Sequence, residues 1–85
     1  MKKIAIISAI LEEPRLCQQQ FNDVVSSFSG IVKGRMGIPF DQENISVISL
    51  TVVGTLDEIN SLTGKLGNIK HVLVKTAVSK KEVGL

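Results

Sequence analysis

The sequence predicts an α+β fold of order βαββαβ, in which two helices cover one face of a four-stranded antiparallel sheet. Three observations predict it. Four segments are rich in β-branched residues, two segments repeat apolar residues at helical spacing, and the two kinds of segment follow one another in that order. Two right-handed strand–helix–strand units can then interleave into a single sheet, the ferredoxin-like arrangement. The 85 residues suffice for one domain.

The first strand is expected over residues 3–10. This stretch carries Ile4, Ile6 and Ile7 with small residues between them, and β-branched residues favour the pleated backbone of a sheet. Because no charge interrupts residues 4–10, we expect this strand to be buried on both faces. Its small residues predict that a helix approaches closely on one side.

A first helix is predicted to begin at Glu12-Glu13-Pro14. Proline suits the first turn, whose N–H groups have no partner, and acidic groups favour the positive end of the helix dipole. We expect this helix to end near Ser29-Gly30, with the glycine in a left-handed cap. Its apolar residues recur at helical spacing and form one stripe: Cys17, Phe21, Val24, Val25 and Phe28.

Two strands joined by a loop are predicted in the middle of the chain. Residues 31–36 form a short strand weakened by Gly34, and residues 37–44 carry the glycine, proline and polar groups of a loop. Residues 45–53 form the clearest strand, with no charge on either face. One set of its alternating side chains is expected on the sheet face that the helices leave open: Val47, Ser49, Thr51 and Val53.

A second helix and a last strand complete the order. Thr55 is expected to be the N-cap, with Glu58 completing a capping box, and Gly67-Asn68 to end the helix. The last strand follows from Ile69. The domain is expected to span residues 1–79 and to leave 80–85 as a frayed tail. The buried stripe of this helix is expected to contain Leu56, Ile59, Leu62, Thr63 and Leu66.

Two helices can cover only one face of such a sheet, and the other face is expected to pair with another subunit. Apolar residues make up 44% of the chain, a large share for a domain with so little interior. An uncharged, flat sheet face is buried favourably against a second sheet. We therefore expect a homo-oligomer, either a dimer or a tetramer, joined through this face.

The composition makes several other partners improbable. Ten basic and eight acidic residues leave a net charge of +2, and three Phe with no Tyr or Trp offer little for stacking on bases. No direct nucleic-acid binding is therefore expected. The longest uncharged apolar stretches, 4–11 and 45–55, are shorter than the ~20 residues of a membrane-spanning helix, so no membrane partner is expected. A single cysteine fits a reducing compartment, which predicts a cytoplasmic location.

Few residues could carry chemistry. His71 is the only histidine and has no partner at metal-ligand spacing. Cys17 lies on an apolar stripe and is expected to be a buried small hydrophobe. Glu12 and Glu13 diverge because they are adjacent, which suits paired acid–base work poorly. No catalytic residue, metal or cofactor is predicted. Gly64 is unfavourable inside a helix and is expected either to allow close packing or to face a ligand or a subunit.

Four segments carry a resemblance to a known family. They are Arg35-x-Gly37-Ile38-Pro39, Ile48-Ser49-Leu50, the stretch from Asp57 to Gly67, and Val72-x-Val74-Lys75-Thr76. They resemble a family of small ACT-like proteins known as iron-only hydrogenase system regulators. The resemblance spans residues 4–77, and Leu62-Thr63-Gly64-Lys65-Leu66-Gly67 is its most specific part. In fold, the family is similar to the C-terminal ligand-sensing domain of the nickel-responsive repressor and to amino-acid-binding ACT domains.

The resemblance implies a cytoplasmic regulatory protein of the iron-only hydrogenase system, acting in transcription or by protein contact. Two departures from the nickel repressor, a single histidine and no preceding DNA-binding segment, argue against direct DNA control by this chain alone. ACT-like domains bind effectors near the first strand–helix loop and at subunit interfaces. By that analogy the ligand-binding residues are expected to be Glu12, Glu13, Arg35, Gly37, Gly64, Lys65 and Gly67.

Three functions remain open at this point. The first is a non-catalytic oligomeric sensor that binds a small effector or a partner protein. The second is a small metal-dependent enzyme whose site is shared across subunits, which stoichiometric metal lost in a His71→Ala variant would favour. The third is a purely structural interaction module, which a broad ligand screen without hits would favour.

Overall fold

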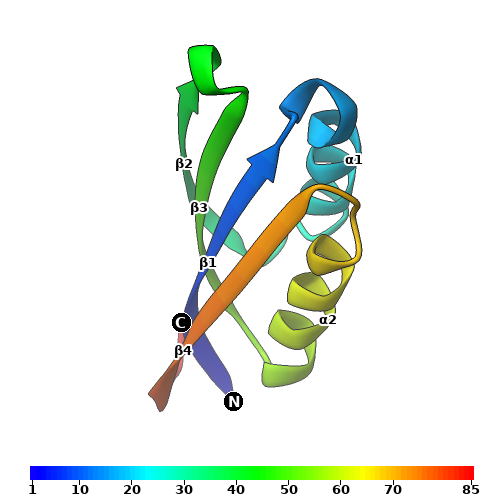
Figure 1. The fold of residues 1–85 in the computed structure, drawn as a ribbon. Helices are drawn as coiled ribbons and strands as arrows, with labels where there is room; N and C mark the ends of the chain where they lie inside the picture. Colours follow the sequence, from blue (N-terminus) through cyan, green and yellow to red (C-terminus); the bar gives the residue numbers. More distant parts are fainter.

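The computed structural model describes all 85 residues and contains the predicted βαββαβ order. Its elements are β1 (Lys2–Glu12), α1 (Pro14–Ser27), β2 (Val32–Phe40), the 3₁₀ turn η1 (Asp41–Glu43), β3 (Ile45–Gly54), α2 (Leu56–Gly67) and β4 (Val72–Val83). The strands pair antiparallel in the order β2-β3-β1-β4, and both helices lie on the same side of the sheet (Figure 1). The predicted α+β, ferredoxin-like fold is confirmed.

The central strand β1 is buried on one face only, which corrects the prediction of burial on both. Ile7 has no exposed surface, whereas its neighbour Ile6 is 49% exposed. The residues facing the helices are fully covered because the helices pack there, and nothing covers the opposite face. The buried set in this strand is Ala5, Ile7, Ala9 and Leu11.

The helices contribute most of the predicted apolar stripes to the core. Cys17, Phe21 and Val25 of α1 are buried, as are Ile59, Leu62 and Leu66 of α2. Leu56 is the exception, since 47% of it is exposed. At about 100° per residue, it lies roughly 90° around α2 from the centre of the stripe, and so it faces away from the sheet.

The helix ends differ from the predicted glycine caps. No glycine in the chain has a positive φ; the positive values belong to Glu13 (58°), Asn44 (57°) and His71 (75°). The end of α1 closes instead through short-range backbone bonds, such as the one from Phe28 N to Val25 O at 3.0 Å. Bonds of this kind tighten the last turn and satisfy its carbonyl groups without a left-handed residue.

The predicted capping box at the start of α2 is confirmed. Glu58 N donates to Thr55 Oγ1 at 3.1 Å, and Thr55 N donates to Glu58 Oε1 at 2.8 Å. The bond from the backbone of Thr55 and the bond from its side chain favour the charged carboxylate, and together they lower the pKa of Glu58.

Both edge strands run further than predicted. β2 continues through Pro39 to Phe40, which an edge strand permits because one row of its backbone groups needs no partner. β4 continues to Val83, which pairs with Lys2 across a register shift in β1. At that shift Ile4 N donates to Ser79 Oγ at 3.1 Å, so the side chain replaces the missing ladder bond. Within residues 80–85, predicted as a frayed tail, only the last two therefore lie outside the strand.

Candidate functional site

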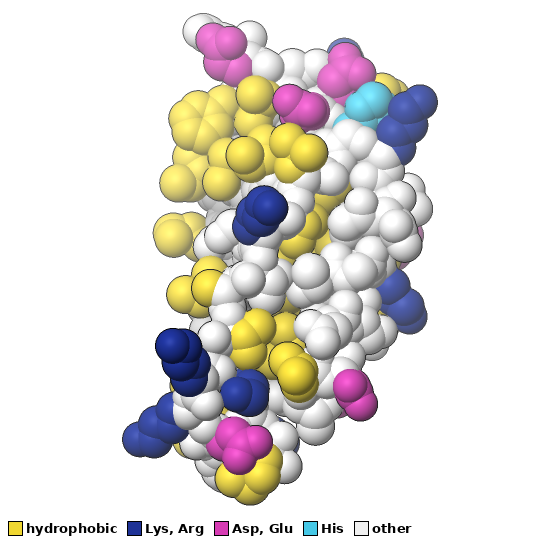
Figure 2. Space-filling view, turned by 60° about the horizontal axis from the view of Figure 1, so that its bottom comes forward, with side chains coloured by type: hydrophobic (Ala, Val, Ile, Leu, Met, Phe, Trp, Pro, Cys, Tyr) yellow, Lys and Arg dark blue, Asp and Glu magenta, His cyan; other side chains and the backbone are white.

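The sheet face opposite the helices, called here the open face, carries six of the ten exposed large hydrophobic side chains of the protein. Cross-strand pairing places its residues, and six large hydrophobic side chains on it are between 40% and 63% exposed: Ile6, Ile10, Met36, Ile38, Phe40 and Leu73. Hydrophobic side chains gather along the left of Figure 2, the side on which Figure 1 shows strands without helices. Exposed apolar surface of this kind marks sites of interaction.

The four residues predicted to form the interface all lie on the open face, but they differ in exposure. Thr51 is exposed, and Val47 and Ser49 are half-buried. Val53 is only 7% exposed, so it is already covered within one protomer and has little surface left to bury. The pairing of subunits through this face stays a prediction.

Two neighbouring rows cross the open face with opposite chemistry. The apolar row runs over all four strands and consists of Ile38, Val47, Ile10 and Leu73. The polar row lies beside it on β3, β1 and β4 and consists of Ser49, Ser8 and Lys75. A hollow of about 650 Å³ spans the two rows near β4, and five of its seven lining residues are hydrophobic.

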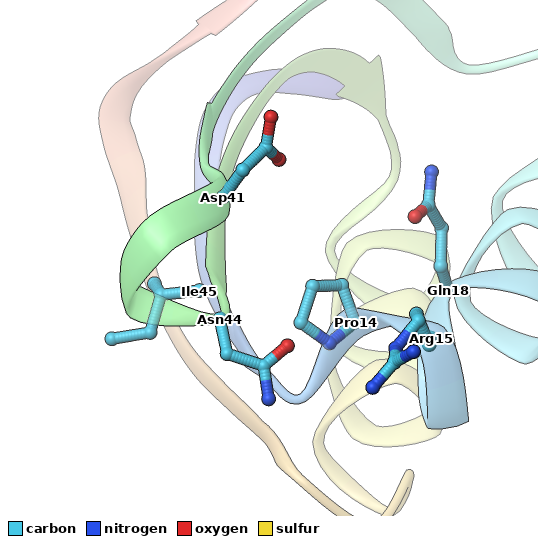
Figure 3. A pocket seen from close by; sticks show the side chains of 6 residues that line it. All are labelled: Pro14, Arg15, Gln18, Asp41, Asn44 and Ile45. Atoms are coloured by element: carbon cyan, nitrogen blue, oxygen red, sulfur yellow. The ribbon is translucent and has the colours of Figure 1, made fainter.

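A second, more polar hollow of about 410 Å³ lies between the start of α1 and the η1 turn. Figure 3 shows side chains from these two segments facing one another across it. The hollow is lined by Pro14, Arg15, Gln18, Asp41, Asn44 and Ile45.

Two of the predicted ligand-binding residues lie beside this second hollow without lining it. Glu13 exchanges bonds with Asn44: Glu13 N donates to Asn44 O at 3.0 Å, and Asn44 Nδ2 donates to Glu13 Oε1 at 3.4 Å. Glu12 N donates to His71 O at 2.8 Å. These contacts join the end of β1 and the residue after it to two loops at one end of the molecule. Glu12 takes part through its backbone, and Glu13 through its backbone and its side chain.

The two predicted cationic residues lie on the helix side of the molecule, one beside a phenylalanine of α1 and the other beside the phenylalanine that caps its end. The Arg35 guanidinium lies 5.7 Å from the Phe21 ring centre and donates to Asn22 Oδ1 at 2.7 Å. The Lys65 ammonium lies 5.3 Å from the Phe28 ring centre. The two rings are seven residues apart, about two turns or ~10 Å along the helix, so the two cations stand at different levels.

The three predicted glycines do not mark a tight contact. A Cβ at Gly64 or Gly67 would meet open space, and one at Gly37 would lie 3.9 Å from Ile48 Cγ1, an ordinary contact. Close packing, one of the two alternatives for Gly64, is therefore wrong, and the other, that Gly64 faces a ligand or a subunit, stays a prediction. The structure brings none of the seven predicted ligand-binding residues into any of its hollows. Ligand binding by these residues stays a prediction.

The residues that sequence reasoning missed are the exposed apolar ones of β1, β2 and β4. Met36, Ile38 and Phe40 alternate with other residues, which is the signal of a strand with one apolar face. Pro39 conceals this signal, because proline beside glycine and polar residues is typical of a loop.

The chain's only thiol and imidazole groups lie apart from the open face. Cys17 is buried as predicted, and burial raises the pKa of its thiol. His71 is half-buried at the turn before β4. No three His, Cys, Asp or Glu side chains come together closely enough to hold a metal ion. Neither helix has the length and apolar character needed to cross a membrane.

The βαββαβ order and the four-stranded antiparallel sheet define a small ferredoxin-like domain with one sheet face uncovered. Within that class, the chain belongs to the TM1266-like family, which carries the provisional description iron-only hydrogenase system regulator and matches residues 3–76. The resemblance noted from the sequence is thereby confirmed. No curated protein matches the sequence.

Two of the solved structures that are similar to this chain illustrate its relationships. The uncharacterized protein TM1266 from Thermotoga maritima is 34% identical, with a TM-score of 0.89 over 94% of this chain and 100% of its own. SnoaB, a cofactor-independent oxygenase from Streptomyces nogalater, is 8% identical, with a TM-score of 0.57 over 100% of this chain and 98% of its own. The second likeness shows the fold alone.

Proposed function

We propose that this protein is a non-catalytic, cytoplasmic regulator of the iron-only hydrogenase system that works as a homo-oligomer and responds to a small effector or a partner protein. Membership of the TM1266-like family supports the process. The single observation that carries the oligomeric mode of action is the open face, with six large hydrophobic side chains exposed on it.

The size of the open face suits a stable interface between subunits. The Cα trace measures 42 × 18 × 17 Å, so the long sheet face projects roughly 700 Å², close to the ~800 Å² that each partner buries in a standard interface. At ~25 cal/mol per Å², hiding even part of this surface offsets much of the entropy lost on association.

A lysine placed at the centre of the open face tests this assembly. Thr51 is exposed and pairs in register with Ile6 on β1, so Thr51→Lys would force an ammonium group between stacked sheets at a cost of several kcal/mol. We expect sedimentation to give a multiple of the 9.2 kDa subunit mass for the wild-type protein and a much weaker assembly for Thr51→Lys.

Gln20→Lys serves as the matched control, because Gln20 is exposed on α1 and the change adds the same charge on the helix side. A wild-type protein of 9.2 kDa at micromolar concentration, or equal assembly of Thr51→Lys and Gln20→Lys, would contradict stacking through the open face.

A genetic experiment tests the regulatory role separately. Deleting the gene in its host should change the level of iron-only hydrogenase activity, and the wild-type gene should restore it. Since assembly is proposed to be required, a folded Thr51→Lys variant should fail to restore it. Unchanged hydrogenase activity after deletion would remove the regulatory assignment.

A further inference from the structure

The only cation within the rows of the open face stands without a counter-charge. Lys75 lies on the edge strand β4, paired with Ser8 across the sheet and flanked on its own face by Leu73 and Ala77. None of these neighbours is acidic. An ammonium group in this position attracts an anion, and it does so more strongly as the apolar surface around it excludes water.

The two serines extend this cationic position into a line of donors. Ser8 is exposed and Ser49 is half-buried, and they are paired in register on β1 and β3. Hydroxyl and ammonium groups both donate hydrogen bonds. The polar row therefore presents three donors side by side across three adjacent strands, which is the chemistry that receives the oxygens of a carboxylate.

The hollow contains both donors of the polar row and side chains of the apolar row. Ser8 and Lys75 line it together with Ile10, Val47 and Leu73, so a molecule resting there would touch the polar row at one end and the apolar row at the other. Its volume of about 650 Å³ lies within the ~300–1,000 Å³ of small-molecule sites. A site that is polar at one end and apolar at the other selects a ligand with one polar end and one apolar end.

We propose that the hollow on the open face binds a small amphipathic monocarboxylate, with the carboxylate on Lys75 and Ser8 and the hydrocarbon portion on the apolar row. The binding site itself lies within one protomer. The role of the carboxylate as the effector rests on the proposed function.

A bound carboxylate would also promote the stacking of subunits. Covering Lys75 with a second sheet would leave an unpaired ammonium group at the rim of the interface, on the edge strand β4, and this weakens the association of the subunits without preventing it. A carboxylate bound beside it removes that penalty. The ligand should then bind the assembled form more tightly than the single subunit and shift the population toward assembly.

Titration calorimetry with octanoate on the full chain tests the site. We expect the wild-type protein to bind octanoate, and Lys75→Met, which keeps the apolar stem and removes the charge, to bind it roughly tenfold or more weakly. The wild-type protein should also bind neutral 1-octanol more weakly than octanoate, by a similar factor. Butanoate, with four fewer methylene groups, should bind on the order of 100-fold more weakly.

Lys70→Met provides the matched control, because Lys70 is exposed in the turn before β4 and outside the open face. Its octanoate affinity should equal that of the wild-type protein. Equal affinity of Lys75→Met and wild type, equal losses in Lys75→Met and Lys70→Met, or no binding of octanoate at millimolar concentration would overturn the proposal.

The outcome is separable from that of the proposed function. If the protein stays a single subunit and binds octanoate through Lys75, the binding site is supported and the proposed assembly is refuted. If the protein is an oligomer and does not bind octanoate, the assembly is supported and the binding site is refuted. Sedimentation with and without octanoate decides whether the ligand acts as an effector, since only an effector raises the assembled fraction.

Discussion

Gly54 is the glycine whose missing side chain the fold requires. A Cβ there would lie 3.0 Å from Glu58 Oε1 and 3.1 Å from Ile31 Cγ2. The carboxylate is held in place by its bond from Thr55 N, so it cannot move aside without losing the cap. A methyl group at this position must therefore disturb either the capping box or the packing of Ile31.

Gly54→Ala should lower the free energy of unfolding by about 1–3 kcal/mol, the usual cost of overpacking. Gly64→Ala is the matched control, since its Cβ would meet open space on α2, and it should raise the free energy of unfolding by about 0.5–1 kcal/mol. Urea unfolding of both variants measures the difference. A Gly54→Ala variant with an unchanged free energy of unfolding would show that the neighbouring side chains can move aside at no cost.

At the scale of one element, the capping box makes the start of α2 sensitive to acid. The pKa of Glu58 in the folded protein lies below the ordinary value of 4.5. The stabilisation by its charge is therefore complete above pH 4.5, the value of the unfolded chain, and is lost as the pH falls through the lower, folded value.

Glu58→Gln should reproduce this loss of stabilisation at neutral pH, because glutamine can still accept the hydrogen bond from Thr55 N but carries no charge. We expect the difference in unfolding midpoint between wild type and Glu58→Gln to be largest above pH 4.5 and to shrink as the pH falls further. Asp57→Asn, in the same first turn but outside the capping box, controls for general charge. A wild-type advantage that persists in strong acid would refute the account.

The elements themselves could be predicted from the sequence to a large extent, because periodicity and the Thr55–Glu58 pair depend on local chemistry. The β1, β3 and α2 segments were found within two residues at each end. The extension of β2 across Pro39 could not be predicted, since it depends on β2 being an edge strand. The conformation of Gly30 could not be predicted either, because 3₁₀-type bonds close α1 instead.

The candidate site could be predicted only in part, for a physical reason. The open face of β3 followed from alternation along one strand. The polar row did not, because Ser8, Ser49 and Lys75 are up to 67 positions apart and meet only through the register of three strands. That register includes shifts between Lys3 and Ala5 and between Val32 and Gly34, which no local pattern indicates.

At the scale of the whole molecule, assembly and folding stability should be linked. If the folded subunits associate and the unfolded chains do not, each tenfold rise in concentration adds about 1.4 kcal/mol to the free energy of unfolding a dimer. The thermal midpoint of the wild-type protein should therefore rise with concentration, as scanning calorimetry can measure. The midpoint of Thr51→Lys should stay constant, and a constant wild-type midpoint would argue against assembly.

The position of β1 at the centre of the sheet also bears on how the chain is made. β1 is synthesised before both of its neighbours in the sheet, β3 and β4, and its Lys2 pairs with Val83 near the far end of β4. A nascent chain that lacks β4 thus carries an unpaired backbone edge at its middle strand, the kind of edge that recruits other chains. The emergence of β4, rather than of any earlier segment, is the event that completes the sheet.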